Sequence, residues 1–475
     1  MKETILKQAY SAEAFTSCSH QVMNMIENEL RMAQTDMPQK TIPYLTPEEE
    51  LKYWEEDFNS GESVTMQELM ERVLSHSIHL HSKQYAGHQV AVPLPVTALS
   101  SAVIGCLNNG PTVYEMGMPA SAMEKIIIGH LAEKFGYDKQ ATGFVTSGGS
   151  LGNLTALVTA RTSTGVMEKD YHRLAIMVSS EAHYSVERAA KIMGISSENV
   201  IKVPADEKHC IRPELLEGLY QKAVSEDKIV FCIVGCACTT AVGAYDDLNA
   251  VADFAEQHNL WFHVDGAHGG PAIFSKKYRH LLAGVERSDS LIMDFHKMMM
   301  APFLSTAVIY NSRNRKVNEF APQAAYLWQD QLSEEWYNSA KHTIECSKPS
   351  TIINTYTIMR LYGDEIYEQH IDAVFGLAKR FAEMVQAREN MEVALPPVSN
   401  IVCFRCLANG RDCNLLNKRI LDELVKDGDW YIVGTTLNDT FYLRVSLMNP
   451  MTDEQCLKKL LDKIQELSRY VCATK

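Results

Sequence analysis

Short apolar runs alternate with helical stretches from about residue 76 to residue 348, and this alternation constrains the fold more than any other feature. The runs are rich in β-branched and large apolar residues and read HRLAIMVSS, IVFCIVG, LWFHVDG, DSLIMDF and LSTAVIY. Amphipathic segments such as DDLNAVADFAEQHNL lie between them. Strands that alternate with helices of this length form parallel sheets with crossover helices. We therefore expect an α/β domain over residues 76–348.

The flanking segments have a different pattern. Residues 1–75 are charged and helical, and TPEEELKYWEEDF places Thr46, Pro47 and then acids at a helix start. After residue 349 a long helical stretch precedes strand-like runs near SNIVCFRC and TFYLRVSLM, and TDEQCLKKLLDKIQELSRYV closes the chain as an amphipathic helix. The sequence thus predicts an N-terminal helical segment over 1–75, a large domain over 76–348 and a small domain over 349–475.

Composition limits the partners of the chain. Its net charge of −14 argues against a nucleic-acid or anionic membrane surface. The start, MKETILKQAYSAEAF, lacks the apolar core of a signal peptide, and no apolar run reaches the roughly 18–20 residues that span a bilayer. Twelve scattered cysteines therefore indicate reduced thiols in a cytoplasmic protein. The close cysteine pairs lack a partner pair at zinc-ribbon spacing, so we expect no metal site.

A glycine-rich turn follows the first strand of this pattern. In GFVTSGGSLGNLTALVTAR, the residues Gly148, Gly149 and Ser150 stand between a strand and a helix. Free amides and the positive end of the helix dipole make such a position an anion site, suited to a phosphate. The alternative is a tight turn that needs glycine for its backbone alone.

Three further residues stand at strand ends. Asp265 ends LWFHVDG and either caps a helix or faces a cationic ligand atom, and His183 in SSEAHYSVERAAKIMG opens a helix, where a histidine is more often structural. Lys297 follows the strand DSLIM, and a lysine is costly to bury unless it is paired or chemically used. Ligands of open α/β sheets bind at the carboxyl ends of strands. An anion turn, an acid, a flat ring and a lysine at one edge suit pyridoxal phosphate held covalently by the lysine.

The segments GFVTSGGSLGNLTAL, SSEAHYSVERAA, HVDGAHGG and DFHKMMMAP, in this order, resemble the pyridoxal-phosphate group II amino acid decarboxylases over roughly residues 75–450. That family includes glutamate, aromatic amino acid, sulfinoalanine and diaminobutyrate decarboxylases. The resemblance implies fold type I of the pyridoxal-phosphate-dependent transferases, an α/β architecture. Its large domain has a mostly parallel seven-stranded sheet, and a small C-terminal α+β domain follows. The resemblance also implies an obligate homodimer with active sites at the subunit interface.

The resemblance assigns cofactor roles to residues of this chain. Lys297 matches the lysine that forms the Schiff base, and His296 matches the histidine that precedes it. Asp265 matches the acid that bonds the pyridine nitrogen, His183 the histidine stacked on the ring, and Ala267 the small residue beside the ring. The resemblance thereby makes Lys297, Asp265 and His183 the core of the expected site.

Further matches concern the phosphate and the substrate. Gly149 and Ser150 match the phosphate-binding turn, and Thr240 or Thr239 matches a cofactor-side threonine. Arg444 matches an arginine near the substrate carboxylate, unless it is a surface arginine at a strand edge.

A loop tyrosine is the expected proton donor. Tyr326, 29 residues after Lys297, matches the mobile-loop tyrosine that protonates the reacting carbon in aromatic decarboxylases, with Tyr337 as a rival. Its phenol would act as the general acid of the reaction.

The expected reaction is decarboxylation of an L-amino acid to the amine and carbon dioxide. The segment HSKQYAGHQVAVPLP matches the family's substrate segment, and its Gly87, His88 and Gln89 favour a polar side chain such as that of 2,4-diaminobutyrate. Aromatic amino acids, glutamate and sulfinoalanine are the alternative substrates. A lyase acting on another bond, an aldehyde-forming oxidase or an idle dimeric homologue are other classes. The intact Lys297 and Asp265 argue against an idle homologue.

The chain departs from the family pattern at three points. Asp294 stands where the family usually has asparagine facing the phosphate, which puts that contact in doubt. His268 replaces a large aromatic residue, and Lys348 with Pro349 replaces a pair of arginines.

Overall fold

The computed structural model describes residues 4–35, 40–311 and 336–473, and this part of the chain divides into two compact units. Unit 1 comprises Met1–His88, Arg380–Ala394 and Val402–Lys475, and unit 2 comprises Gln89–Lys379 and Leu395–Ile401. Each unit is therefore assembled from segments distant in sequence. The three-domain division at residues 75 and 348 stays a prediction.

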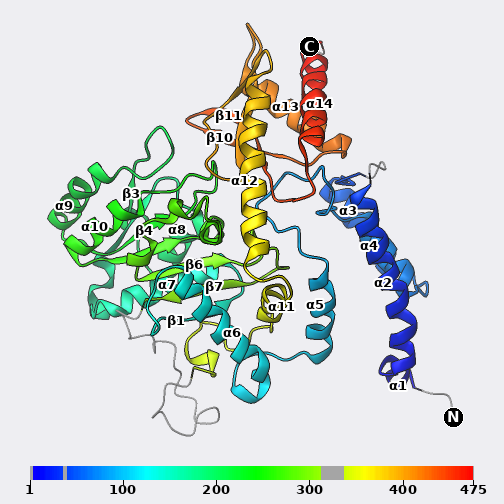
Figure 1. Cartoon of the computed structure of the whole chain (residues 1–475), viewed down its shortest axis with the longest axis horizontal. Helices are drawn as coiled ribbons and strands as arrows, with labels where there is room; N and C mark the ends of the chain where they lie inside the picture. The colour runs from blue at the N-terminus through cyan, green and yellow to red at the C-terminus, as the bar shows by residue number, and fades with distance from the viewer. Residues whose placement is uncertain (1–3, 36–39, 312–335, 474–475) are drawn as a thin grey trace. The chain divides into compact units, whose positions relative to one another are not determined.

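Unit 2 is built on a seven-stranded sheet in the order β1-β7-β6-β5-β4-β2-β3 (Figure 1). Its strands are β1 (Thr142–Thr146), β2 (Leu174–Ser179), β3 (Val200–Val203), β4 (Ile229–Cys236), β5 (Trp261–Asp265), β6 (Ser290–Asp294) and β7 (Thr306–Tyr310). Neighbours from β3 to β6 pair in parallel, whereas β7 pairs antiparallel to both β6 and β1. The carboxyl ends of β1, β2, β4, β5 and β6 therefore lie at one edge.

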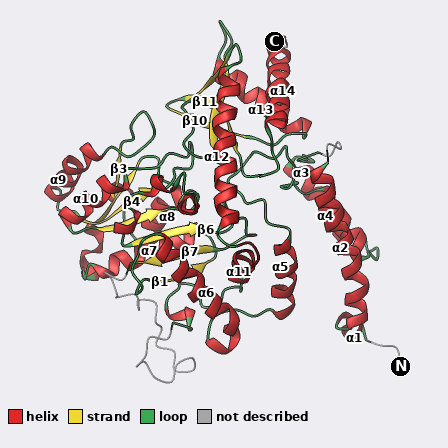
Figure 2. Cartoon of the chain, viewed as in Figure 1, coloured by secondary structure: helices red, strands yellow, loops and turns green. Residues whose placement is uncertain are grey.

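Helices cover both faces of this sheet, as the red ribbons around the yellow strands of unit 2 show (Figure 2). Those wholly in unit 2 are α5 (Val96–Leu107), α6 (Tyr114–Lys134), α7 (Gly149–Ser163), α8 (Tyr184–Ile192), α9 (Leu216–Ser225), α10 (Leu248–His258) and α11 (Ile352–Tyr362). The helix α12 (Glu365–Gln386) contributes residues to both units.

Alternate strand residues face different helices, because side chains of a strand point to opposite faces in turn. Cys232 and Val234 of β4 join α7 and α8 in one apolar cluster. Gly235, the next residue, faces Leu248 of α10 on the other side. The strands are thus buried on both faces, which explains their continuous apolar runs.

Unit 1 contains a four-stranded sheet in the order β10-β11-β9-β8 and the terminal helices. The strands are β8 (Met391–Val393), β9 (Ile401–Cys406), β10 (Val433–Leu437) and β11 (Thr440–Ser446). The helices are α1 (Ile5–Ala9), α2 (Ala12–Gln34), α3 (Pro47–Asn59), α4 (Met66–Ser75), α13 (Cys413–Asp427) and α14 (Glu454–Ala473). Thr46 caps α3 in a capping box with Glu49, as the sequence predicts.

All twelve cysteines are free thiols. Within the described residues, no cluster of three or more histidine, cysteine or acidic side chains could hold a metal ion. No helix in the same ranges is long and apolar enough to cross a membrane.

Candidate active site

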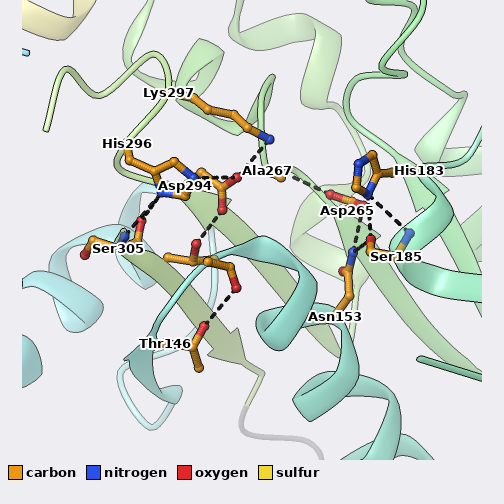
Figure 3. Close-up of polar contacts among 12 residues, drawn as sticks. Thr146, Asn153, His183, Ser185, Asp265, Ala267, Asp294, His296, Lys297 and Ser305 are labelled. Atoms are coloured by element: carbon orange, nitrogen blue, oxygen red, sulfur yellow. Dashed lines mark hydrogen bonds and ion pairs between the residues drawn. The ribbon is translucent and has the colours of Figure 1, made fainter. Parts of the chain in front are cut away.

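Lys297 stands just past β6, three residues after the buried Asp294 that ends this strand. Its Nζ lies 2.8 Å from Asp294 Oδ2, and Thr306 Oγ1 donates a hydrogen bond to Asp294 Oδ1 (Figure 3). Burial alone would lower the pKa of Lys297, but the charge of Asp294 outweighs it and raises the pKa above the ordinary value. Burial likewise acts to raise the pKa of Asp294, yet the charges of Lys297 and His296 bring it below its usual range. The pair is therefore ionised.

His296 is held by the backbone of the segment before β7. Its Nδ1 lies 2.9 Å from the carbonyl oxygen of Ser305 and 3.2 Å from the Ser305 nitrogen. Its Nε2 is 3.6 Å from Asp294 Oδ2, a distance that forms an ion pair only when the imidazole is protonated. His296 thus lies beside the Asp294 carboxylate that pairs with Lys297.

Asp265 ends β5, and its carboxylate is 7% exposed. Asn153 Nδ2 donates to Asp265 Oδ2 at 2.9 Å, and the backbone amide of Ala267 donates to Oδ1 at 3.2 Å (Figure 3). The Asp265 carboxylate is therefore held in one orientation in the wall of the site.

His183 caps the N-terminus of α8 and accepts a hydrogen bond from the Ser185 backbone amide at 3.3 Å. Its Nδ1 also lies 2.8 Å from Ser185 Oγ. Burial lowers the pKa of His183, although the negative charge of Asp265 acts in the opposite direction. The imidazole is therefore a mostly neutral, fixed ring.

The turn before α7 brings backbone amides to the same edge. Gly148 has φ +100°, a conformation that favours glycine, and no side chain caps α7 within the described chain. A Cβ on Gly149 would lie 3.0 Å from Asp294 Oδ1, so a side chain there would crowd the carboxylate. The amides of the turn are therefore uncapped and can bind an anion, whereas the charge of the neighbouring Asp294 carboxylate acts against one.

These groups line one cavity of about 350 Å³. Among the residues predicted from the sequence, its lining includes Gln89, Gly148, Gly149, Ser150, His183, Thr240, Asp265, Ala267, His296 and Lys297. The other lining residues are Ser147, Asn153, Ser185, Cys236, Cys238, His268, Asp294 and Leu304. Thr240 lines the cavity, whereas the Thr239 hydroxyl accepts from the Ala244 amide within its own loop.

Two residues predicted to contact the substrate, His88 and Arg444, both belong to unit 1. His88 Nε2 lies 3.0 Å from the Tyr431 hydroxyl. Partial burial and the charge of Arg444 lower the pKa of His88. Arg444 is buried on β11 opposite Val433, so it is not the exposed strand-edge arginine that the sequence left open.

The expected loop tyrosine, Tyr326, lies outside the described residues. Its rival Tyr337 packs against Tyr114, with ring centroids 5.5 Å apart. His268, one of the departures from the family pattern, bonds Asn400 Oδ1 through Nε2 at 2.8 Å.

Sequence reasoning missed several residues of the site. Asn153, Ser185 and the buried His263 were not singled out, although they contact Asp265 or its hydrogen-bond partners. A signal was present, because His263 and Asp265 are two residues apart in a strand and face the same side. Asn153 likewise follows Gly149 by one helical turn.

Comparison with known proteins identifies the family. Residues 67–407 match the family described as the pyridoxal-dependent decarboxylase conserved domain. The chain belongs to this family. It is therefore a pyridoxal-phosphate-dependent amino acid decarboxylase, a carboxy-lyase.

Individual relatives span several substrates. The chain is 29% identical to the aromatic-L-amino-acid decarboxylase of Bacillus atrophaeus, over 76% of each chain. It is 26% identical to the acidic amino acid decarboxylase GADL1 of Xenopus tropicalis, over 94% of this chain and 92% of the relative. The crystal structure of mouse CSAD superposes with a TM-score of 0.88 at 24% identity, over 96% of this chain and 99% of the mouse chain. This likeness identifies the fold as fold type I, as predicted.

The residues around the cavity fit pyridoxal phosphate. An amine, an oriented carboxylate and a fixed imidazole provide one partner each for an aldehyde carbon, a ring nitrogen and a ring face. The amides before α7 suit a phosphate. Gln89 Nε2 is buried and meets no acceptor within the described chain, so the cavity still has a donor to offer.

Proposed function

We propose that this decarboxylase acts on an L-amino acid with a short polar side chain, with 2,4-diaminobutyrate as the first candidate. Gln89 carries the proposal: it comes from the segment that the sequence links to substrate choice, and it lines the cavity. Its amide nitrogen has no acceptor within the described residues. An amide can present either its carbonyl oxygen to an ammonium or its N–H groups to a carboxylate. A buried amide disfavours an aromatic ring, because the ring would leave it unpaired.

A second candidate is an acidic amino acid, such as glutamate or sulfinoalanine. As the structure orients it, Gln89 turns a donor toward the cavity, and an acidic side chain would accept from it. The names of two relatives, an acidic amino acid decarboxylase and a cysteine sulfinic acid decarboxylase, agree with this choice.

Each residue of the cavity has a separate proposed role in the reaction. When bound, pyridoxal phosphate supplies an electron-withdrawing ring for the electron pair left behind by the departing carboxylate. Lys297 would hold the aldehyde carbon of the cofactor, and Asp265 would keep a proton on the ring nitrogen. His183 would cover one ring face, with Ala267 beside the ring, and Gly149 and Ser150 would bind the phosphate. His296 and Thr240 would complete the cofactor contacts.

Burial explains why this arrangement is effective. Asp265 is held by Asn153 and Ala267 before any ligand binds, so no reorganisation is needed when charge develops. The apolar strands behind it exclude water. We propose Tyr326 for the final proton transfer to the reacting carbon, Arg444 as the partner of the substrate carboxylate, and His88 as a further substrate contact.

The substrate test measures carbon dioxide and amine together. The panel contains the twenty amino acids with 2,4-diaminobutyrate and sulfinoalanine, and each product is identified under air so that aldehyde formation is seen. We expect the highest kcat/KM for 2,4-diaminobutyrate. An aromatic amino acid as the best substrate would contradict the polar-substrate proposal.

A charge change at Gln89 tests whether this residue contacts the substrate side chain. Gln89→Glu places a carboxylate in the cavity, so it should improve the ratio of kcat/KM for diaminobutyrate over glutamate by about tenfold. Gln89→Leu, the matched apolar control, should lower kcat/KM for both substrates by a similar factor. If Gln89→Glu leaves the ratio unchanged, Gln89 does not contact the substrate side chain.

We further propose that the enzyme is a homodimer. Leu99, Val103 and Leu107 recur at intervals of four along α5 and are each more than half exposed. Such an apolar stripe is typical of an interface. Light scattering coupled to size exclusion should give about twice the chain mass of 53.4 kDa, and a monomer at micromolar concentration would refute the proposal.

We place the enzyme in the cytoplasm, since twelve free thiols suit a reducing compartment. Cell fractionation tests the location. Recovery with secreted or membrane fractions would contradict it.

A further inference from the structure

A continuous line of buried hydrogen bonds runs behind Asp265. Trp261 Nε1 donates to Ser290 Oγ at 2.8 Å, and Ser290 Oγ lies 2.8 Å from His263 Nδ1. His263 Nε2 lies 2.9 Å from Asn153 Oδ1, and Asn153 Nδ2 donates to Asp265 Oδ2 at 2.9 Å. The side chains that form this line are all buried, at exposures from 0% to 7%. Figure 3 shows the end of the line, where Asn153 points at Asp265.

The groups at the two ends determine which atom donates in each of these hydrogen bonds. An indole N–H can only donate, so Ser290 accepts from Trp261 and keeps its hydroxyl hydrogen available to donate to His263 Nδ1. The carboxylate of Asp265 can only accept, so Asn153 turns its nitrogen to Asp265 and its oxygen to His263. Since Asn153 presents an oxygen to Nε2, His263 has its proton on Nε2, and a ring that accepts from Ser290 at Nδ1 is neutral.

The surroundings of His263 agree with this state. Burial lowers the pKa of His263 to about 4, even though the charge of Asp265 acts to raise it. The ring is therefore uncharged at neutral pH. Neither ring nitrogen is left over for another role, because Ser290 and Asn153 occupy both.

The Asn153 amide also serves a second partner. Its Nδ2 lies 2.8 Å from Ser185 Oγ, which in turn lies 2.8 Å from His183 Nδ1. One amide nitrogen thus bonds Asp265 directly and reaches His183 through one hydroxyl. A single side chain on α7 therefore joins the two groups that the proposed function sets against the cofactor ring.

We infer that Asn153 and His263 are positioning residues of the active site. His263 locks the amide of Asn153 with its nitrogen toward Asp265, and that amide orients the Asp265 carboxylate and the Ser185–His183 pair. Without the N–H of His263, the Asn153 amide can rotate, and its oxygen can then face the Asp265 carboxylate. This inference rests on the proposed roles of Asp265 and His183.

Variants at His263 test the lock. His263→Leu removes both hydrogen bonds, whereas His263→Gln keeps an N–H at about the position of Nε2. Since a hydrogen bond to a charged group is involved, we expect His263→Leu to lower kcat by about ten- to a hundredfold, with KM within about threefold. The Kd for pyridoxal phosphate, measured by titration of the apoenzyme, should rise by about tenfold. His263→Gln should recover most of both losses, which a role in packing alone would not produce.

Asn153→Leu should behave like His263→Leu, and Thr159→Val is its matched control. Thr159 lies on the same helix, is equally buried, and bonds the Thr155 carbonyl and the Tyr310 hydroxyl away from the cavity. Thr159→Val should leave kcat and the cofactor Kd within about twofold of the parent. Equal losses in Thr159→Val and Asn153→Leu would overturn the inference.

The tautomer of His263 can be measured in the parent apoenzyme, so this test does not depend on the folding of a variant. Nitrogen-15 NMR of histidine-labelled protein at pH 7 reports the tautomer of each of the 16 histidines, and the signal lost in His263→Gln identifies His263. We expect a neutral ring with the proton on Nε2. If the His263→Gln sample does not fold, the Nε2 resonance is identified by through-bond transfer from selectively labelled neighbours instead. A proton on Nδ1, or a charged ring, would overturn the inference.

The variant Asp265→Ala distinguishes a failure of the proposed function from a failure of the positioning role. If Asp265→Ala keeps the parent kcat, the proposed function is wrong at this residue. If Asp265→Ala loses activity while folded His263→Leu and Asn153→Leu match the parent in kcat and cofactor Kd, the proposed function stands and the positioning role is refuted.

Discussion

Lys297 and Lys348 are two lysines of unit 2 that are each paired with a buried carboxylate, but they differ in what else surrounds the ammonium group. Lys297 Nζ lies 2.8 Å from Asp294, lines the cavity, and its side chain is 23% exposed. Lys348 Nζ lies 2.9 Å from Glu124 and donates to the Val145 carbonyl at 2.7 Å, and its side chain is 2% exposed. Burial and a partner acid therefore do not mark a lysine as catalytic. Access to a cavity with other functional groups does.

The difference predicts a separation of activity from stability. Lys348 joins Glu124 of α6 to the end of β1 in a dry environment, where a lost partner leaves a charge uncompensated. Around Asp294, in contrast, Thr306 and His296 remain as partners when Lys297 is removed, and the adjoining cavity admits water. Substitutions at the two lysines should thus have opposite consequences.

The largest effect is expected at Lys297. Lys297→Ala removes the amine proposed to hold the cofactor, so carbon dioxide release should fall by at least about a thousandfold. The midpoint of thermal unfolding should change by only a few degrees. Product assays with saturating pyridoxal phosphate, together with calorimetry, measure both quantities. Near-parental turnover would show that Lys297 and Lys348 do not differ as proposed.

Lys348→Met should destabilise the fold by about 3–5 kcal/mol, because the Glu124 carboxylate is left buried without its partner. The kcat per folded molecule should stay within about twofold of the parent, since Lys348 does not line the cavity. Urea unfolding gives the free energy, and active-site titration gives the folded fraction. A large loss of kcat in fully folded protein would place Lys348 in the active site.

The pH dependence of cofactor binding sharpens the comparison. Only the neutral amine of Lys297 can attack an aldehyde, and Asp294 raises the pKa of Lys297, so the rate of cofactor uptake should increase with pH. Removing the charge in Asp294→Asn lowers that pKa and should move the midpoint of the increase down by about 1–3 pH units. Asp265 and Cys238 also act on Lys297 and are unchanged in this variant.

Stopped-flow absorbance of apoenzyme mixed with pyridoxal phosphate between pH 6 and 10 provides the measurement. Glu124→Gln, the counterpart at the other pair, should leave the midpoint in place. An unmoved midpoint in Asp294→Asn would mean that Asp294 does not control the protonation of Lys297.

The smallest effect is expected when both members of the second pair are replaced. Lys348→Met with Glu124→Leu removes both charges, and apolar pairs of similar volume often substitute for a buried ion pair without loss. The double variant should lie within about 1 kcal/mol of the parent, the remainder reflecting the unbonded Val145 carbonyl. Urea unfolding of the single and double variants completes the cycle. Additive losses would show that the two side chains act independently.

The fold was predictable where the pattern is local. Continuous apolar runs buried on both faces predict strands of a parallel sheet, and five of the seven strands pair in this way. The run LSTAVIY, which forms β7, looks the same in sequence but pairs antiparallel to β6 and β1. Its connection from Asp294 to Thr306 contains no crossover helix, and parallel pairing needs one.

The site was predictable where residues stand at strand ends. Gly149, His183, Asp265 and Lys297 line the cavity because parallel strands bring their carboxyl ends together. Asn153 and His263, 110 positions apart, were not predicted, because their contact depends on how α7 packs on β5. Within LWFHVDG the histidine looks like one more core residue. The variants at Asn153 and His263 described above test their roles.

The segmented make-up of unit 1 has a consequence for the order of folding during synthesis. Met1–His88 must combine with residues that begin at Arg380 and continue from Val402, and residues 88 and 402 are 314 positions apart. At translation rates of roughly 5–20 residues per second, the first helices wait about 15–60 seconds for these partners. Unit 2, nearly complete once residue 379 has emerged, can collapse in the meantime. In this interval apolar residues that the finished unit buries, such as Tyr85 and Ala86, are still exposed and present a surface for a chaperone on the ribosome.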